Sequence, residues 1–532
     1  MRALTVTVTF AALLVCIALP AQEDALQQRF DDLDANGDGR VTAEEAGGAA
    51  WFARLDANGD GAVTLEEAQL AVRREATARQ AEELAQLGVG PVVRSESDSF
   101  TNVAFTRDYV PGQRDDSGQW SGGTETLRLI AHDGMLFASL GYWTDLPYLQ
   151  DKGDEPWTGA QVLIKESADG PWRVDASFGR NTLRTEGMLS TTFTADAAGN
   201  ALDEPVAMLI AGPSSRGSTS AWTRNDLTGE WAASELRGFR GGIRSFCAHV
   251  DRVTGVHHLF AGLSRGQIVA GVYDPDAPGR LNWADDAELS GTGRVMTMVE
   301  ANGVLYAACG IDSDEVASGG LFMRIDGPQP RWERVWRWPY KLIEDKDESE
   351  IMRGLTAVPD PNGGDHEVIV GTCAYPGVVY RIDPANDHEA VRELDIRAYF
   401  AEAWGVAFLR GPCLSAYNRM APAIDPDTGE PVHLVPLCVA HPDGGGTEMG
   451  LSSWYLVRHA DGSYAHGRVH DPQAPPPNPP HGLVATRTLE VSPFPEDSGR
   501  VICAGGYDGA ANDRQNHNTA WIYRGTLGGD EG

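Results

Sequence analysis

A turn and a short apolar strand stand together in Glu300-Ala-Asn-Gly-Val-Leu305-Tyr-Ala-Ala-Cys-Gly310. Asn and Gly favour the turn because both tolerate a positive φ, and a short apolar run bounded by turn residues is typical of a buried strand. Runs of this kind recur seven times in the chain, as Leu136–Gly141, Ala207–Gly212, His258–Gly262, Leu305–Gly310, Val368–Cys373, Leu434–Cys438 and Val501–Gly505. The pattern predicts a mainly β fold.

Each of these runs is expected to be the second of four strands. An apolar strand and a turn precede it, and a third strand follows across a polar loop, as in Gln161–Ile164. A fourth, more polar strand often opens with a tryptophan, which is expected to pack between neighbouring units: Trp172, Trp231, Trp283 and Trp332. The last unit lacks a fourth strand of its own, and the segment Phe100–Phe105 is expected to supply it.

Seven units of four strands, at intervals of roughly 50 to 70 residues, resemble a seven-bladed β-propeller. This resemblance implies a propeller over residues 96–532. Ser167-Ala-Asp-Gly-Pro-Trp172 resembles a shortened Asp-box of sialidase-like propellers, and Tyr380-Arg-Ile-Asp-Pro384 resembles strand ends in gluconolactonase-like propellers. The alternative is a β-sandwich followed by a second β domain.

Two acidic segments near the N-terminus share one twelve-residue pattern, Asp34-Ala-Asn-Gly-Asp-Gly-Arg-Val-Thr-Ala-Glu-Glu45 and Asp56-Ala-Asn-Gly-Asp-Gly-Ala-Val-Thr-Leu-Glu-Glu67. Both resemble the EF-hand loop, in which calcium takes oxygen ligands from positions 1, 3 and 5, a backbone carbonyl at 7 and a bidentate glutamate at 12. The expected ligands of the first loop are Asp34, Asn36, Asp38, the carbonyl of Arg40, and Glu45. Those of the second loop are Asp56, Asn58, Asp60, the carbonyl of Ala62, and Glu67.

Other positions in the two loops fit the same family. Gly39 and Gly61 fill position 6, where the chain turns sharply and a Cβ is expected to obstruct it. Val41 and Val63 are expected to pair as a short ladder between the loops.

The loops begin 22 residues apart, which leaves one short helix around Glu44–Leu55. Trp51 and Phe52 are expected to pack against Phe30 and Leu33. This spacing also resembles dockerin repeats, although those loops usually end in Asp. We expect a small α-helical EF-hand domain over residues 22–72 and a helical linker over 73–95.

The first residues indicate a signal peptide over 1–21. Arg2 supplies the positive start, Leu4–Ala18 is an apolar stretch, and Ala21 ends a small-residue cleavage site. The expected location is secreted or periplasmic, with no transmembrane span. The alternatives are a membrane anchor, or a lipid on Cys16, where the small residue of a bacterial lipoprotein box is replaced by Val15.

The charge and the cysteine content limit which partners and which cysteine oxidation states are possible. The formal net charge of −33 repels nucleic acid and favours cations, so we expect no nucleic-acid partner. Six cysteines remain beyond Cys16: Cys247, Cys309, Cys373, Cys413, Cys438 and Cys503. An oxidising compartment permits disulfides among them, whereas their apolar strand context favours buried thiols.

In a propeller the loops that enter the first strand of each blade lie on one face, around an axial funnel. Arginines recur near these positions, at Arg128, Arg244, Arg294, Arg353 and Arg487, and tyrosines are expected on the same face at Tyr142, Tyr375 and Tyr507. Guanidinium groups bind carboxylates and sulfates bidentately, and aromatic rings suit sugar faces. We therefore expect an anionic glycan, or another exported protein, as the ligand.

The sequence is also compatible with two other interpretations. Each arginine can instead tie its strand to a neighbouring acid, such as Glu125, Glu186 or Glu350. The chain can also be a glycoside hydrolase or polysaccharide lyase that acts on an acidic carbohydrate. An axial metal cluster, as in carotenoid-oxygenase propellers, has no supporting motif in this sequence. Its ligands would be histidines that are scattered along the chain: His249, His258, His441, His481 and His517.

Overall fold

The computed structural model describes residues 27–47, 51–56, 59–65, 67–68, 99–142, 158–215, 217–310, 319–337, 352–373, 377–406, 414–415, 419–440, 451–470, 485–507 and 518–528. One compact unit holds the described residues of Met1–Val89 and Phe400–Leu409, and the other holds those of Gly90–Tyr399 and Arg410–Gly532. The expected signal peptide 1–21 and linker 73–95 lie outside the described residues. No helix within the described ranges is long and apolar enough to cross a bilayer.

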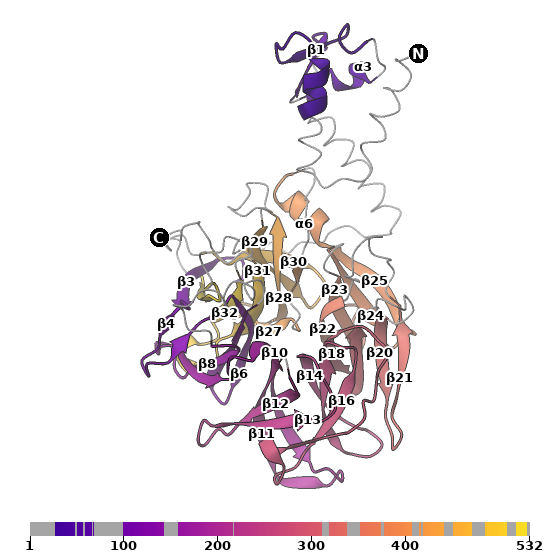
Figure 1. The fold of residues 1–532 in the computed structure, drawn as a ribbon. Coiled ribbons are helices and arrows are strands. Elements are labelled where there is room, and N and C mark those ends of the chain that lie inside the picture. Colours follow the sequence, from indigo (N-terminus) through magenta and orange to yellow (C-terminus); the bar gives the residue numbers. More distant parts are fainter. Residues whose placement is uncertain are drawn as a thin grey trace. The chain divides into compact units, whose positions relative to one another are not determined.

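The N-terminal unit is built around a short antiparallel ladder (Figure 1). Strands β1 (Arg40–Thr42) and β2 (Ala62–Thr64) pair with Val41 opposite Val63, as predicted. The two valines share a core with Phe30 and Phe52, against which Leu33 and Trp51 pack, so the predicted aromatic contacts are also confirmed.

The predicted start of the intervening helix at Glu44 is wrong. Residues 43–47 form turns, and helix α3 is described at Phe52–Leu55. Gly47 has a φ of 63°, which ends a right-handed helical turn before α3 begins.

The larger unit is mainly β, and three of its sheets are separate and four-stranded, with the strands paired antiparallel in chain order. They contain β14 (Ile243–Val250), β15 (His257–Leu263), β16 (Ile268–Tyr273) and β17 (Leu281–Trp283); β18 (Val295–Ala301), β19 (Val304–Cys309), β20 (Gly320–Ile325) and β21 (Arg331–Trp336); and β22 (Met352–Pro359), β23 (Glu367–Cys373), β24 (Val378–Asp383) and β25 (Glu389–Asp395).

A twelve-stranded sheet contains three more sets of four strands, linked by the residue pairs Arg184–Gly141 and Tyr507–Glu125. The sets are β6 (Glu125–His132), β7 (Met135–Gly141), β8 (Gln161–Lys165) and β9 (Arg173–Ser177); β10 (Thr182–Ala195), β11 (Ala201–Ser215), β12 (Thr219–Arg224) and β13 (Trp231–Leu236); and β31 (Ala485–Val491), β32 (Val501–Tyr507), β33 (Ile522–Leu527) and β3 (Val103–Tyr109).

The remaining described strands form a five-stranded sheet and a small hairpin. The sheet contains β26 (Leu414–Ser415), β27 (Ala421–Ile424), β28 (Pro431–Ala440), β29 (Leu451–His459) and β30 (Tyr464–Arg468). The hairpin is β4 (Gln113–Arg114) with β5 (Trp120–Ser121), and helix α6 (Ile396–Ala403) follows β25.

The predicted strands are present where the apolar runs lie. The seven runs lie in β7, β11, β15, β19, β23, β28 and β32, and only Gly310, which follows the last residue of β19, falls outside its strand. The segment near Phe100–Phe105 also pairs with the last described strand as predicted, because β3 lies beside β33 with Val103 opposite Leu527.

The core lies between neighbouring sheets. Phe260 of β15 packs with Leu305 of β19 and Phe322 of β20, and all three are buried. Full burial of such side chains contributes about 1.5–3 kcal/mol each. The pleat places alternate residues on the two faces of each sheet, so apolar residues on both faces hold adjacent sheets together.

Tryptophans link one set of four strands to the preceding set. Trp231 Nε1 donates to Asp175 Oδ2 at 2.7 Å, and Arg224 Nε donates to the same oxygen at 2.9 Å. Two further sets have this arrangement, Trp172 with Asp108 and Lys165, and Trp332 with Glu288 and Arg324. The predicted position of these tryptophans between units is confirmed at these places.

No disulfide joins any two of the five described cysteines, Cys247, Cys309, Cys373, Cys438 and Cys503, and Cys413 lies outside the described residues. Burial raises the pKa of Cys247 and Cys309 to about 12. These thiols are therefore neutral at pH 7 and pack as small apolar groups.

Candidate functional site

The first of the two acidic loops, Asp34–Glu45, curls its backbone around the carboxylate of Asp34. Asp34 Oδ1 accepts the N–H groups of Gly37 at 2.9 Å and Asp38 at 3.1 Å, and Oδ2 accepts that of Gly39 at 2.7 Å. Asn36 Oδ1 accepts the N–H of Asp38 at 2.9 Å. The oxygens at positions 1 and 3 thus turn towards the inside of the loop.

The glutamate at position 12 is held by a capping box in both loops. Glu45 Oε2 accepts the N–H of Thr42 at 2.9 Å, and Thr42 Oγ1 accepts the N–H of Glu45 at 3.3 Å. Thr64 and Glu67 repeat these contacts at 2.9 and 3.2 Å. The hydrogen bond from the Thr42 backbone lowers the pKa of Glu45, which keeps this carboxylate ionised and directed at the loop.

Position 6 needs glycine for a different reason from the one expected. A Cβ built on Gly39 or Gly61 meets no atom within 4 Å, so the expected obstruction is wrong. Their φ values are 78° and 82°, in the left-handed region, which costs other residues about 1–2 kcal/mol. Backbone conformation therefore sets the requirement.

The second loop repeats the geometry and contacts the first. Asp56 accepts the N–H groups of Asp60 at 3.1 Å and Gly61 at 3.0 Å, while Asn58 lies outside the described residues. Arg40 Nη2 lies 2.5 Å from Asp60 Oδ2. The sequence predicted a carbonyl ligand at Arg40 but gave no sign that its side chain reaches a ligand of the other loop.

The oxygens of the two loops fit calcium, a hard cation that prefers carboxylate, amide and carbonyl oxygens. No three His, Cys, Asp or Glu side chains of the described residues come together as a metal-binding group. The loop carboxylates instead accept backbone N–H groups, as those of Asp34 and Asp56 do. Calcium would draw on the same oxygens.

A second group of charged side chains gathers at the starts of three first strands. Glu186 of β10 is 5% exposed, and its Oε1 lies 2.5 Å from Arg184 Nη2 and 2.9 Å from Arg244 Nη1. Arg128 of β6 donates to the backbone carbonyls of Glu186 at 2.8 Å and Arg244 at 3.3 Å. Glu125, 1% exposed, lies 3.9 Å from Arg184 Nη1.

Arg419 belongs to the same group and was missed by the sequence reasoning. Burial lowers the pKa of Arg128 to about 9; Glu186 opposes this shift and the positive charge of Arg419 adds to it. The Arg419 side chain is exposed, and the structure gives it no hydrogen bond to another described residue. We call Arg128, Arg184, Arg244 and Arg419, with Glu125 and Glu186, the arginine cluster.

A signal for Arg419 does exist in the sequence. Arg419-Met-Ala-Pro-Ala-Ile424 leads into β27 as Arg244, Arg294 and Arg353 lead into or start their strands. Pro422 and the shortness of β27 hide this similarity.

The other predicted funnel residues lie in varied surroundings. Arg294 is exposed, Arg353 is half-buried, and Arg487 is buried in β31. Tyr142 is buried, with its hydroxyl 3.3 Å from Thr158 Oγ1. Tyr375 and the side chain of Tyr507 lie outside the described residues.

Of the histidines considered for an axial metal cluster, His441, His481 and His517 lie outside the described residues. His249 lies opposite His258 in the β14–β15 pair, and its ring contacts Glu300 at 2.6 Å and Asp326 at 3.0 Å.

Comparisons with known proteins bear on the N-terminal unit. The EF hand family model matches residues 26–45 and 49–69, which implies calcium binding by this part of the chain. No curated protein matches the chain in sequence. A solved structure titled "Crystal Structure of Mitotic Checkpoint Complex" has 10% sequence identity and a TM-score of 0.36, with 82% of this chain and 97% of that chain covered. A likeness of that size carries no inference about function.

Proposed function

We propose that this is an exported calcium-binding protein in which an EF-hand pair precedes a seven-bladed β-propeller, and that the propeller binds an anionic ligand. An acidic glycan is the ligand class that we favour.

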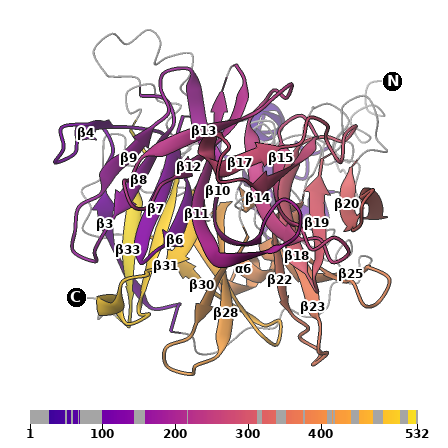
Figure 2. The same cartoon turned by 90° about the horizontal axis from the view of Figure 1, so that it is seen from below.

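The packing of the first strands supports a circular arrangement. Strands β6, β10, β14, β18 and β22 contact one another in that order, and β31 contacts β6 (Figure 2). Leu129 N–H donates to Thr488 Oγ1 at 2.9 Å between β6 and β31, and Met420 N–H donates to Thr356 Oγ1 at 2.8 Å between the start of β27 and β22. Strand β3 completes the last set of four, as expected where a ring closes.

The charge balance of the arginine cluster carries the ligand proposal. The cluster contains four guanidinium groups and two carboxylates, although the whole chain has a net charge of −33. Arg244 of β14 pairs with Glu186 of β10, and Arg184 of β10 lies beside Glu125 of β6 as well as Glu186, which accounts for these two arginines as links between strands. Arg419 is exposed and close enough to Arg128 to lower its pKa, so a bound anion would relieve this repulsion.

Calorimetric titration of the full chain with calcium tests the first part of the proposal. We expect two sites, of which Asp34→Ala removes one and Asp56→Ala the other. Asp276→Ala, at an exposed turn, is the matched control and retains both sites. A wild-type chain with no calcium heat would contradict the assignment.

Binding of a sulfated oligosaccharide and of oligogalacturonate tests the second part. Loss of one charge-assisted contact is worth about 1.5–3 kcal/mol, so Arg419→Ala should weaken binding at least about tenfold. Arg331→Ala removes an arginine that is 64% exposed and pairs with Glu333, and it should leave binding unchanged. Equal affinities of both variants would refute the anion site. Release of reducing ends in the same mixture would indicate the glycoside hydrolase or polysaccharide lyase.

N-terminal sequencing of the protein recovered from outside the cytoplasm tests export. The mature chain is expected to begin after Ala21, and an intact Met1 in that fraction would contradict the signal peptide.

A further inference from the structure

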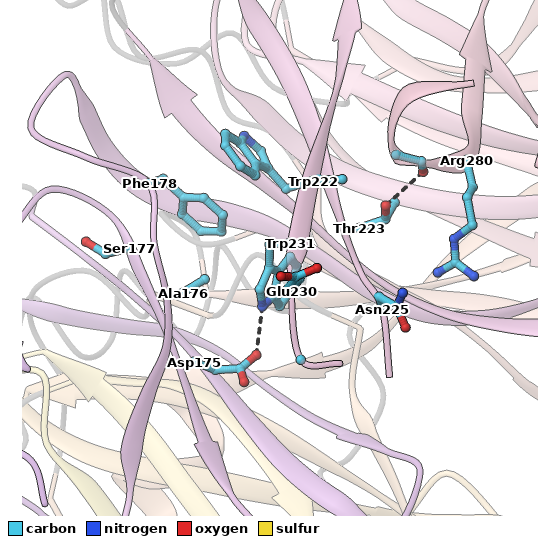
Figure 3. Close-up of a pocket in the computed structure, with 13 residues that line it drawn as sticks. Asp175, Ala176, Ser177, Phe178, Trp222, Thr223, Asn225, Glu230, Trp231 and Arg280 are labelled. Atoms are coloured by element: carbon cyan, nitrogen blue, oxygen red, sulfur yellow. Dashed lines mark hydrogen bonds between the residues drawn. The ribbon is translucent and has the colours of Figure 1, made fainter. Parts of the chain in front are cut away.

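A pocket of about 540 Å³ lies between the end of β9 and the β12–β13 hairpin, on the outer strands of two neighbouring sets (Figure 3). Small-molecule sites usually measure about 300–1,000 Å³. The arginine cluster lies on first strands, so this pocket is a different place in the fold.

One wall of the pocket is aromatic. The ring of Phe178 lies 5.2 Å from that of Trp222 at 55° and 5.9 Å from that of Trp231 at 88°. All three rings are half-buried, and Trp231 is fixed by its hydrogen bond of 2.7 Å to Asp175. Figure 3 shows Phe178 and Trp222 beside each other above Trp231. The protein therefore presents partly open aromatic faces whose positions are set before any ligand arrives.

The rim of the pocket is polar and carries balanced charge. Asn225, Glu230 and Ser177 are exposed. Arg280 donates through Nη2 to the carbonyl of Arg224 at 2.9 Å, which holds it at the opposite side from the aromatic wall. Glu230 and Arg280 are one acid and one base on the lining.

The remaining charge in the lining is already neutralised. Asp175 Oδ2 accepts Arg224 Nε at 2.9 Å in addition to the Trp231 indole. A cationic ligand would thus meet Arg280, and an anionic ligand would meet Glu230. The balance favours a neutral occupant that has both apolar faces and many hydroxyl groups.

We propose that this pocket binds one ring of a neutral oligosaccharide. The C–H face of a pyranose packs on Trp222 and Phe178, because aromatic rings have large apolar faces that need no polar partner. The hydroxyl groups around that ring donate to Glu230 and accept from Arg280, and Asn225 supplies both functions. The inference does not rest on the anionic ligand of the proposed function.

Tryptophan fluorescence and calorimetry of the full chain test the pocket with maltohexaose, cellohexaose and mannohexaose as probes. We expect at least one of them to bind and to change the tryptophan emission. Trp222→Ala and Phe178→Ala should each weaken that binding about tenfold, the difference that roughly 1.4 kcal/mol makes. Leu227→Ala is the matched control, because Leu227 is 97% exposed on the same β12–β13 turn and does not line the pocket.

Glu230→Gln tests whether weaker binding is caused by loss of the fold, because Glu230 is exposed and its replacement leaves the aromatic wall intact. This variant should weaken binding while the thermal unfolding curve stays unchanged. Absence of binding by all three oligosaccharides at millimolar concentration would overturn the proposal. So would equal binding by the Trp222→Ala and Leu227→Ala variants, or binding of tetramethylammonium or oligogalacturonate that Trp222→Ala abolishes. Sulfated oligosaccharide binding is measured on the same variants, and it should not change, so failure at one site is distinguishable from failure at the other.

Discussion

Arg324→Met should strongly destabilise the β unit. The Arg324 guanidinium is 1% exposed and binds three carboxylates, Glu288 at 2.9 Å, Asp251 at 2.9 Å and Asp326 at 2.6 Å. Burial alone would lower the pKa of Arg324, but the hydrogen bonds to these acids outweigh it and raise the pKa. Methionine has a similar length and no charge, so the substitution isolates the loss of the cation.

The expected loss of stability depends on the hydrogen bonds that the three carboxylates retain after the substitution. Asp251 retains the N–H groups of Val253, Thr254 and Gly327, whereas Glu288 retains the Trp332 indole at 3.3 Å. Each acid would nevertheless stay in place without its buried cation, and breaking a buried pair costs about 3–5 kcal/mol. That is a large part of a total stability that is typically about 5–15 kcal/mol.

Arg252→Ala is the matched control, because Arg252 binds the same Asp326 at 2.8 Å but is 52% exposed. Exposed pairs contribute about 0–1 kcal/mol and are screened by salt. Urea unfolding followed by tryptophan fluorescence should show a large fall in the midpoint for Arg324→Met and a small one for Arg252→Ala. High salt should remove the small effect and leave the large one. A loss below about 1 kcal/mol for Arg324→Met, or equal losses in both variants, would refute the reasoning from burial.

Three further results are expected. Burial alone would lower the pKa of His249, but hydrogen bonds to Glu300 and Asp326 raise it. His249 therefore contributes fully to the free energy of unfolding below its pKa in the unfolded chain, and this contribution is lost as the pH rises through its pKa in the folded chain. Urea midpoints should therefore fall from pH 6 to pH 9, and His249→Gln should remove part of that fall; parallel pH profiles would contradict this. Burial raises the pKa of Glu490 from 4.5 to about 7. Its contribution to the free energy of unfolding is therefore present at pH 4 and is lost as the pH rises through 7. Glu490→Gln should be more stable than the wild type at pH 8.5 by up to about 3 kcal/mol, with no difference at pH 4; a lower midpoint at pH 8.5 would count against it. Arg40→Ala frees the carboxylate of Asp60 from a competing cation, so calorimetry should show calcium binding a few-fold tighter, and weaker binding would mean that the arginine assists the site.

The sequence could predict those features that depend on residues close together in the chain. The strand β19 follows from Leu305–Gly310 because a buried strand needs consecutive apolar residues, and the turn before it needs Gly303 at a φ of 70°. The EF-hand match and the ladder between the two loops follow from a pattern contained within twelve residues, whereas the calcium ligands themselves stay a prediction. Even in these loops the reason for Gly39 was predicted wrongly, because there is room for a Cβ and the positive φ of the backbone is what requires glycine.

Contacts between distant residues could not be predicted in the same way. Arg128 and Arg244 are 116 positions apart, and nothing local in either strand tells which carbonyl an arginine reaches. The same limit applies to the pocket, whose wall joins Phe178 of one set of strands to Trp222 of the next. Strands β10 and β11 also extend through polar residues such as Ser190 and Thr192, where hydrogen bonding across the hairpin maintains pairing without an apolar run.

The pairing of β3 with β33 has a consequence for biosynthesis. Thr106 and Arg524, which face each other in this pair, are 418 positions apart. At translation rates of about 5–20 residues per second, β3 leaves the ribosome roughly 20 to 80 seconds before its partner exists. During that interval its backbone edge is open to other strands, including those of neighbouring nascent chains. Any cell that makes this protein must therefore keep the early segment from premature pairing until the late strand arrives.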